Sequence, residues 1–417
     1  MTVRHVMAVL FLGIVAGQGR AQEPDPVNEC QACHLELYDE FLEPAEVFSE
    51  DIHSRTGFTC ADCHGGDPTV FDMDLAHDPE SGFVGVPRPE DIPFMCESCH
   101  GDPVFMQRYN PSLAVDQVAK YWSSQHGKGL LKGDTRVATC GTCHAVHRIL
   151  PKSDPRSLVY PTRVASTCNG CHGDKDLMFE HDLPSTAFEE YRASVHGIAL
   201  MEKQDLSAPT CNDCHGNHGA IPPGVRSVKM VCGQCHPNNQ RIFESTKMSK
   251  VIEERGLHGC VVCHGNHRIL HPEDTLISME EGKGVCARCH TPGDPGSRQA
   301  VLIRSALDTL ILAIGRAEGE IDQAERLGME IDDALFDVQG AKEVLIKSRT
   351  MIHSLDGREV EKTAVPGLDL ARRARLTAQE AATDFKNRRV WLGIATTTIT
   401  FLVIVLYLTI RRLEKRK

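Results

Sequence analysis

The sequence predicts a mostly α-helical protein with few strands, in which a domain poor in aromatic side chains precedes an antiparallel helical bundle and one transmembrane helix. Three observations predict this fold class: a short cysteine motif that recurs at intervals, a change to helical periodicity near residue 297, and an uncharged stretch close to the last residue. Only 5% of the 417 residues are aromatic, whereas there are 18 Cys and 21 His. The formal net charge is −12, and an acidic chain without a basic stripe argues against nucleic acid as a partner.

The first 21 residues read as a secretory signal peptide. Basic Arg4 is followed by an apolar run, residues 6–16, and Ala21 is a plausible cleavage point. The run is too short to span a bilayer. An uncleaved anchor is the alternative, and either reading predicts that the following domain is exported.

All eighteen cysteines fall in nine Cys-x-x-Cys-His motifs, which are the attachment signature of c-type haem. Two thiols three residues apart can bind the two vinyl groups of one porphyrin, and the adjacent His then supplies the proximal iron ligand. The cysteines are Cys30, Cys33, Cys60, Cys63, Cys96, Cys99, Cys140, Cys143, Cys168, Cys171, Cys211, Cys214, Cys232, Cys235, Cys260, Cys263, Cys286 and Cys289. The proximal ligands are His34, His64, His100, His144, His172, His215, His236, His264 and His290.

Zinc knuckles and dithiol redox sites are the alternative readings of one isolated motif. Nine copies that use every cysteine, behind a signal peptide, predict nine haem c groups instead. The porphyrins would then form the core of residues 22–296, which explains the low aromatic content. Without them this region buries too little apolar surface to offset its chain entropy.

An internal repeat groups the motifs in pairs. Four repeats start at Cys30, Cys96, Cys168 and Cys232, and Cys286 opens a truncated fifth. Each repeat is predicted to hold one motif, a connecting helix with an aromatic residue five positions before a His, and a second motif. Three second motifs are followed by a further His, as in Cys-His-Gly-Asn-His267. The first repeat has Asp67 at that place, and the fourth has Met248 where the connecting helix should carry His.

These recurring positions supply candidates for the distal iron ligand. Six histidines recur in register: His53, His126, His147, His196, His218 and His267. Five further candidates are His77, Met248, His181, His258 and His271, and for each of these a packing or surface role competes with ligation. If Met248 ligates, His/Met coordination raises the potential of its haem. The sequence predicts that His353, in the later helical segment, is solvated.

Residues 297–389 show a new period and hold no cysteine. Apolar residues alternate steps of three and four from Ile303 to Ala324 and again from Ile331 to Ile352, with turns at Gly328 and at Asp356-Gly357. A third helix is predicted to start near Pro366. The segment reads as a bundle or stalk that supports the haem domain, or alternatively as a docking surface for a membrane partner.

Residues 390–410 carry no charge and have the length of one transmembrane helix. The basic tail, residues 411–417, predicts a cytoplasmic end under the positive-inside rule, so the bulk of the protein should lie in the periplasm at the inner membrane. The span contains no His, so it cannot by itself ligate a buried b-type haem.

Four stretches resemble the multihaem c-type cytochromes built from doubled motifs: residues 76–85, 121–126, 153–157 and 260–267. The resemblance covers residues 28–295 and, more loosely, the helical tail. It implies periplasmic electron transfer, often beside a membrane cytochrome b or a quinol-oxidising subunit that passes electrons onward to periplasmic or extracellular acceptors.

An electron-transfer protein is therefore the favoured reading, and no catalytic residue is predicted. The alternative is a multihaem reductase of the nitrite, hydroxylamine or tetrathionate type, which keeps one haem open on its distal side. All nine motifs here end in His, and spare histidines are present to close every iron. A polymerising haem wire is disfavoured by the membrane anchor.

Overall fold

The computed structural model describes residues 28–221, 231–280 and 282–415, and these residues form helices, turns and loops without a strand. The predicted signal peptide and the last two residues of the basic tail lie outside them. Chain contacts divide the molecule into two compact units, residues 1–163 and residues 164–417. The mostly α-helical fold class is confirmed, whereas the domain boundaries at residues 296 and 389 stay predictions.

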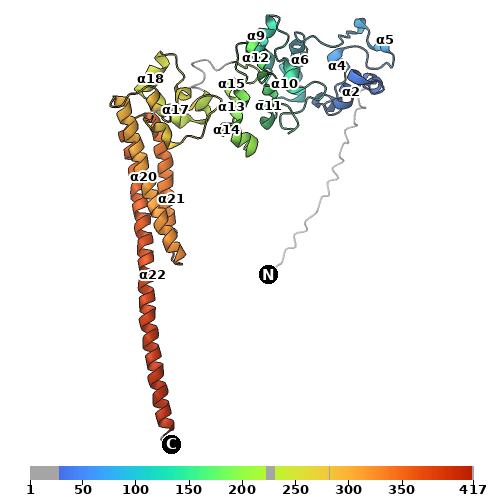
Figure 1. The fold of residues 1–417 in the computed structure, drawn as a ribbon. Helices are drawn as coiled ribbons and strands as arrows, with labels where there is room; N and C mark the ends of the chain where they lie inside the picture. Colours follow the sequence, from blue (N-terminus) through green and yellow to red (C-terminus); the bar gives the residue numbers. More distant parts are fainter. Residues whose placement is uncertain (1–27, 222–230, 281, 416–417) are drawn as a thin grey trace, which may run out of the picture. The chain divides into compact units, whose positions relative to one another are not determined.

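The first unit is built from short helices joined by long loops (Figure 1). Half of them begin at an Asp, Asn or Ser whose side chain accepts a hydrogen bond from the first turn, as Asp102 does before α7. Its elements are α1 (Glu29–His34), η1 (Asp39–Phe41), α2 (Leu42–Phe48), α3 (Ile52–Arg55), α4 (Ala61–His64), α5 (Met73–Ala76), η2 (Pro79–Ser81), α6 (Ile92–His100), α7 (Pro103–Tyr109), α8 (Gln117–Ser123), α9 (Gln125–Leu131) and α10 (Cys140–His144).

Helix α11 (Pro161–His172) contains the boundary between the units, and the second unit continues the pattern of short helices before the stalk begins. Residues 231–235 are also helical. The labelled elements are α12 (Lys175–Glu180), α13 (Ala187–Arg192), α14 (Val195–Gly197), η3 (Ile198–Glu202), α15 (Cys211–His215), α17 (Pro237–Glu244), α18 (Lys247–Glu254), α19 (Gly259–His264), η4 (Asp274–Ile277) and η5 (Cys286–Arg288).

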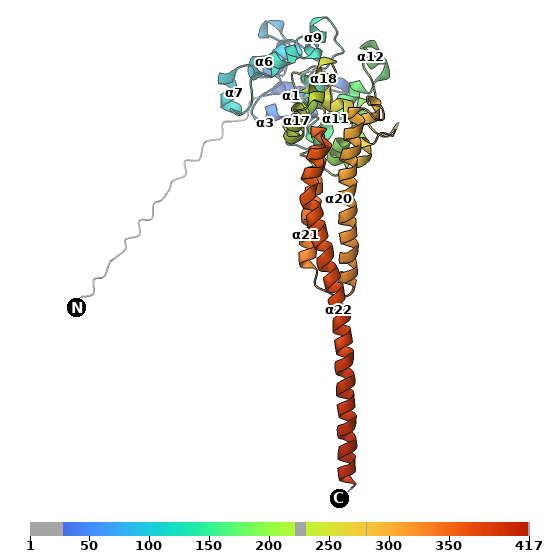
Figure 2. The ribbon, with the colours of Figure 1, turned by 90° about the vertical axis from the view of Figure 1, so that its left-hand side faces the viewer.

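The stalk consists of three long helices, which lie side by side in both ribbon views (Figures 1 and 2). They are α20 (Pro295–Arg326), α21 (Asp332–Met351) and α22 (Gly357–Glu414), with the short η6 (Ile352–Ser354) between the last two. The predicted seam of α20 is buried throughout, from Ile303 to Ala324, and α21 buries Ala334, Val338 and Ala341 against it. Small alanines on α22 complete the core, so the helices can approach closely.

The third helix starts earlier than the sequence indicated. Helix α22 begins at Gly357 behind the N-cap Asp356, and Pro366 lies inside it on an exposed face. The cap decides the start, because the Asp356 carboxylate accepts a bond from Arg358 N–H at the first turn. A Cβ on Gly357 would lie 2.4 Å from the Cβ of Leu302, so this end of α22 packs directly on α20.

Helix α22 leaves the bundle and continues as the apolar segment (Figure 2). It is long and apolar enough to cross a membrane, with a mean hydropathy of 2.1 in its most apolar window, and none of that window is buried in the protein. Threonine hydroxyls in the span, such as those of Thr396 and Thr400, donate to carbonyls one turn earlier. Trp391 and Tyr407 mark the two ends. This helix supports single-pass membrane anchoring.

The buried apolar clusters of the described residues lie in the stalk or at its contact with Ile277. The motif-bearing part buries only scattered side chains, such as Met106, Leu130 and Leu200, while Tyr38 and Phe179 are more than four-fifths exposed. The described side chains of the motif-bearing part therefore form no continuous apolar core of their own. This is expected of a domain whose core is made by haem groups.

Candidate haem-binding sites

Helical turns present the motif cysteines. In α6, α11 and α15 both cysteines and the following His lie within one helix, so the i, i+3 spacing places the two thiols on the same face. The last motif differs, because Cys286 lies in the short η5 and His290 follows it outside any helix. No disulfide joins the eighteen cysteines, all of which lie among the described residues, and none of them is fully buried.

The first cysteines of the two motifs lie side by side within each repeat. The thiol of Cys96 hydrogen bonds with that of Cys140, which raises the pKa of Cys96 and lowers the pKa of Cys140. Matching bonds to Cys168 and Cys260 lower the pKa values of Cys211 and Cys232 to about 7. In the first repeat, burial raises the pKa of Cys30 and the neighbouring thiol of Cys60 contributes next. These contacts bring the first cysteines of the two motifs near each other, while the division into doubled repeats stays a prediction.

Within each unit, cysteines of successive repeats are close enough to influence each other electrostatically. Burial raises the pKa of Cys63, with smaller contributions from nearby acids and from Cys99 of the next repeat. Cys214 is affected in the same way by Cys235. Burial is the main reason that the pKa of Cys263 is raised to about 11, and the neighbouring thiol of Cys286 in the truncated repeat contributes next. Within each unit, every motif therefore neighbours the next one along the chain.

In each repeat the stretch from the aromatic residue to the candidate ligand spans two short helices and not the single helix that the sequence predicted. The aromatic residue lies in the first helix and the candidate ligand at the second position of the next helix, as with Tyr121 in α8 and His126 in α9. Ser124 separates the two helices, because its hydroxyl caps the second helix by accepting a 2.9 Å hydrogen bond from Gly127 N–H. Ser194 and Thr246 cap α14 and α18 in the same way.

Met248 therefore occupies the same local position as the histidines of the other repeats. It is the second residue of α18, behind the cap Thr246, as His196 is the second residue of α14 behind Ser194. The side chain of Met248 is half-buried. The alignment of Met248 with those histidines, which the sequence suggested, therefore extends to its place in the helix.

The second repeat is fastened to the first by the segment after its second motif. The N–H of Ile52 donates to the carbonyl of Ile149 at 2.9 Å, and the carboxylate of Asp51 accepts from Ile149 N–H at 2.6 Å. Asp51 is 1% exposed and also accepts from the backbone and ring of His53. In the second unit, Val195 N–H donates to the Ile269 carbonyl at 2.8 Å, which repeats the arrangement.

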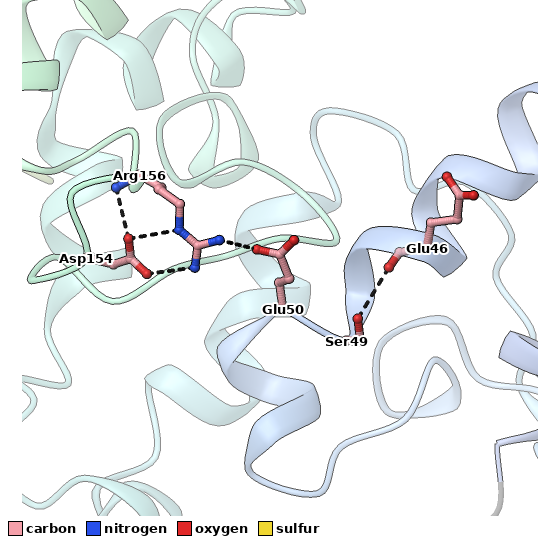
Figure 3. Close-up of polar contacts among 5 residues, drawn as sticks. All are labelled: Glu46, Ser49, Glu50, Asp154 and Arg156. Carbon is pink, nitrogen blue, oxygen red and sulfur yellow. Dashed lines mark hydrogen bonds and ion pairs between the residues drawn. The ribbon is translucent and has the colours of Figure 1, made fainter.

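An ion pair at the surface supports this junction (Figure 3). Arg156 binds both carboxylate oxygens of Asp154, at 3.2 and 3.0 Å, and also pairs with Glu50, the residue before Asp51. Ser49 closes the end of α2 by donating to the Glu46 carbonyl. The segments that carry His53 and His147 are held together by these bonds.

Among the described residues, six ring contacts join a motif histidine to a histidine from outside the motifs. Each of these pairs consists of one proximal candidate and one other His. The ring centroids are separated by 6.1 Å (His34–His77), 6.0 Å (His53–His100), 5.9 Å (His64–His147), 6.4 Å (His196–His236), 5.9 Å (His215–His267) and 6.2 Å (His264–His353).

The pairs cross between repeats. His53 of the first repeat faces His100 of the second, while His147 of the second faces His64 of the first. The third and fourth repeats exchange histidines in the same manner, through His196 with His236 and His267 with His215. The backbone bonds of Ile149 and Ile269 set this register, because each lies two residues after one of the exchanged histidines.

Several of these rings are fixed through Nδ1. His64 Nδ1 lies 2.8 Å from the Gly85 carbonyl, and His215 Nδ1 lies 3.2 Å from that of Ile221. A carbonyl only accepts, so Nδ1 carries the proton and Nε2 keeps its lone pair for a metal. His290 Nδ1 is 3.1 Å from the Asp294 carboxylate. Burial also lowers the pKa values of His147, His196, His264 and His267, which favours the neutral imidazole that binds metals.

The remaining candidates have varied surroundings. His126 is the second residue of α9, in the shared register, and His218 follows α15. His181 caps α12; burial is the main cause of the lowered pKa of His172, with His215 and His181 contributing. His258 precedes α19 with a buried Nδ1 that has no hydrogen-bond partner among the described residues, and His271 is exposed.

The sequence missed His353. It was expected to be solvated, but it is half-buried in η6 with its ring opposite His264. No motif or repeat surrounds it, so no sequence signal could have marked it.

Two comparisons with known proteins found similar sequences. The family model described as cytochrome c3 matches residues 52–173. The multiheme cytochrome MtrA of Shewanella baltica (strain OS185) is 23% identical over 285 residues, which cover 64% of this chain and 76% of that protein. No solved structure matches the chain. These findings support a multihaem c-type cytochrome.

The geometry of these histidine pairs fits covalently bound haem. A metal–imidazole nitrogen bond is about 2 Å long and the ring centre lies about 1 Å beyond the nitrogen, so two axial imidazoles have centroids about 6 Å apart. Ordinary aromatic contacts span about 4.5–7 Å, so distance alone does not select this reading. The composition of the pairs favours haem ligation, because each of these pairs combines a motif His with a different His from outside the motifs.

Proposed function

We propose that this protein is a membrane-anchored, nine-haem cytochrome that carries electrons along its chain of haems. The observation that carries the proposal is that six motif histidines each lie beside a histidine from outside the motifs, so that the two imidazoles of each pair could together hold one haem iron. When bound, each haem supplies one-electron oxidation and reduction of its iron.

The chain's own residues hold the haems in sequence order. Because Cys63 neighbours Cys99 and Cys214 neighbours Cys235, haems of consecutive repeats would be attached at adjacent sulfurs. The pairing of first cysteines, as in Cys96 with Cys140, does the same inside a repeat. Electrons could then pass between neighbours within each unit without a substrate pocket.

The donor that we propose is a quinol-oxidising or cytochrome b subunit of the inner membrane, and the acceptors are periplasmic or extracellular. The basic residues Arg411 and Arg412 after the span favour a cytoplasmic tail and a periplasmic haem domain. The nine haem count rests on the nine motifs.

The stalk sets a condition on that donor. Helix α22 runs without a break from Gly357, at its haem-side end, to Val390, where the span begins. At 1.5 Å per residue this is about 50 Å along the helix axis. Quinol in the bilayer would therefore be out of direct reach of a haem at that end of the stalk, so the donor that we propose projects from the membrane to this end.

Spectroscopy of the detergent-solubilised full chain tests the electron-transfer proposal. With haem quantified per chain, nine haems that are low-spin by EPR and optical spectra are expected. A high-spin haem that binds nitrite or hydroxylamine would overturn pure electron transfer and favour the reductase alternative.

A vesicle experiment tests the donor. The cytochrome is reconstituted with a quinol, with and without membranes that contain the quinol-oxidising complex. Its haems should stay oxidised with quinol alone and become reduced with the complex present, while dithionite reduces both samples. Rapid reduction by quinol alone would contradict the spacing argument.

A further inference from the structure

The stalk contributes a residue that faces one of the motif histidines. His353 lies in η6, the short connection between α21 and α22, and its ring centroid is 6.2 Å from that of His264, with the planes inclined by 26°. His264 ends the motif of Cys260 and Cys263 in α19. The separation and the near-parallel planes repeat those of His64–His147 and His215–His267.

The hydrogen bond of His353 fixes its tautomer. Nδ1 lies 2.9 Å from the Thr350 carbonyl, one turn earlier. A carbonyl oxygen accepts only, so Nδ1–H donates and Nε2 keeps its lone pair. Metal-binding histidines commonly donate their other ring N–H to a backbone carbonyl or a carboxylate in this way, which orients the ring.

Several contacts hold η6 against the motif-bearing part, so the approach of His353 is not that of a loose surface side chain. Arg349 forms a two-armed ion pair with Asp274 of η4, at 2.7 and 3.1 Å. Ile352 packs on a cluster that combines Ile277 with Leu307 and Val360 of the stalk. Helix α17 also contacts η6. The stalk and the fourth repeat are therefore docked where the two rings meet.

We propose that His353 is the distal iron ligand of the haem attached to Cys260 and Cys263. This inference rests on the proposed haem function and deepens it, because it makes the stalk part of one haem site. The ligand would come from the helical segment that leads into the membrane, whereas His53, His147, His196 and His267 come from neighbouring repeats. That haem would be fixed at the far end of the stalk, about 50 Å from the span along α22.

The test compares His353→Ala with the neighbouring Ser354→Ala in the full chain in detergent. Haem per chain should be unchanged in both, since attachment uses Cys260 and Cys263. His353→Ala is expected to gain one high-spin haem by EPR and to bind one more equivalent of CO after reduction than the parent protein. Ser354→Ala should match the parent. Equal low-spin content and equal CO binding in His353→Ala would overturn the proposal.

A second variant keeps the test decisive if the alanine variant folds poorly. His353→Met supplies a thioether ligand, so it should return the haem to the low-spin state and move one step of the redox titration to a higher potential. A spectrum and titration identical to the parent would show that residue 353 does not touch iron. If the parent protein itself contained no haem, the proposed function would be refuted. This result is distinct from both outcomes for the variants at residue 353.

Discussion

The carboxylate of Asp51 accepts a 2.6 Å hydrogen bond from the backbone N–H of Ile149 and so ties the first repeat to the second. The same carboxylate orients His53 through its ring Nδ1 and its backbone N–H. One buried acid thus holds the two segments from which His53 and His147 approach their partner rings.

Replacing Asp51 by Asn should destabilise the protein in a pH-dependent manner. Asn presents an NH₂ donor where one carboxylate oxygen accepted, so we expect the free energy of unfolding at pH 7 to fall by about 1–3 kcal/mol. Burial alone would raise the pKa of Asp51, but the bonds from His53 and Ile149 outweigh it and lower the pKa below the model-compound value of 3.8.

A carboxyl whose pKa is lowered by folding contributes stability above its unfolded value and loses it as the pH falls through the folded value. The difference between parent and Asp51→Asn should therefore shrink in acid below pH 3.8, measured by urea unfolding followed by circular dichroism. Asp205→Asn, at an exposed loop cap, should change stability by less than about 1 kcal/mol. A difference that stays constant down to low pH would refute the role of the ionised carboxylate.

Removing His147 should open the haem of Cys60 and Cys63. The ring of His147 faces His64, so His147→Ala should convert one haem to the high-spin state and allow CO to bind it after reduction. Val146→Ala, which alters the exposed side chain next to His147, should leave the spectra unchanged. The assignment is wrong if His147→Ala retains the low-spin content of the parent.

Met248→His should lower the potential of one haem. The register of the pairs, in which His53 faces His100 and His196 faces His236, assigns Met248 to the haem of His290 in the truncated repeat. His/Met coordination gives a higher potential than bis-His coordination. A spectroelectrochemical titration should show one step moving to lower potential, and an unchanged titration would exclude Met248 as a ligand and direct the search to His258.

Gly65→Ala should destabilise the site of His64. Gly65 has φ +67°, and a Cβ there would lie 2.0 Å from the carbonyl oxygen of Gly82. The 82–85 segment would have to move, although it receives the Nδ1–H bond of His64 at Gly85. We expect a loss of more than about 1 kcal/mol in urea unfolding.

The matched control is Gly315→Ala, on an exposed face of α20, where a new Cβ would meet nothing within 4 Å. Alanine is the better helix former, so this change should stabilise by up to about 1 kcal/mol. Equal effects of the two substitutions would contradict the steric explanation.

Ending the chain after Arg389 should release the protein from the membrane without changing its haems. The buried core of the stalk ends by Ala382, so the truncation removes only exposed residues of α22. We expect a protein that stays in the supernatant without detergent and keeps the parent spectrum and haem content. Sedimentation with membranes would show a second attachment site.

The sequence by itself determined the attachment chemistry, the repeat and the stalk. The nine motifs are local, since two cysteines and one His within five residues define each, and helix periodicity marked the buried seam from Ile303 to Ala324. The shared register of His53, His196 and Met248 was also visible, although the caps that split the connecting helix in two were overlooked. Those caps are Ser, Thr and Asp residues and could have been found.

Only the tertiary structure decided which histidine faces which motif. Partners such as His64 and His147, or His264 and His353, come from different repeats or from the stalk, and nothing near either residue encodes the other. Long-range backbone bonds, such as that from Ile52 to Ile149, set those distances. A ligand pair around one iron is a property of two segments at once, so it follows from packing and not from local spacing.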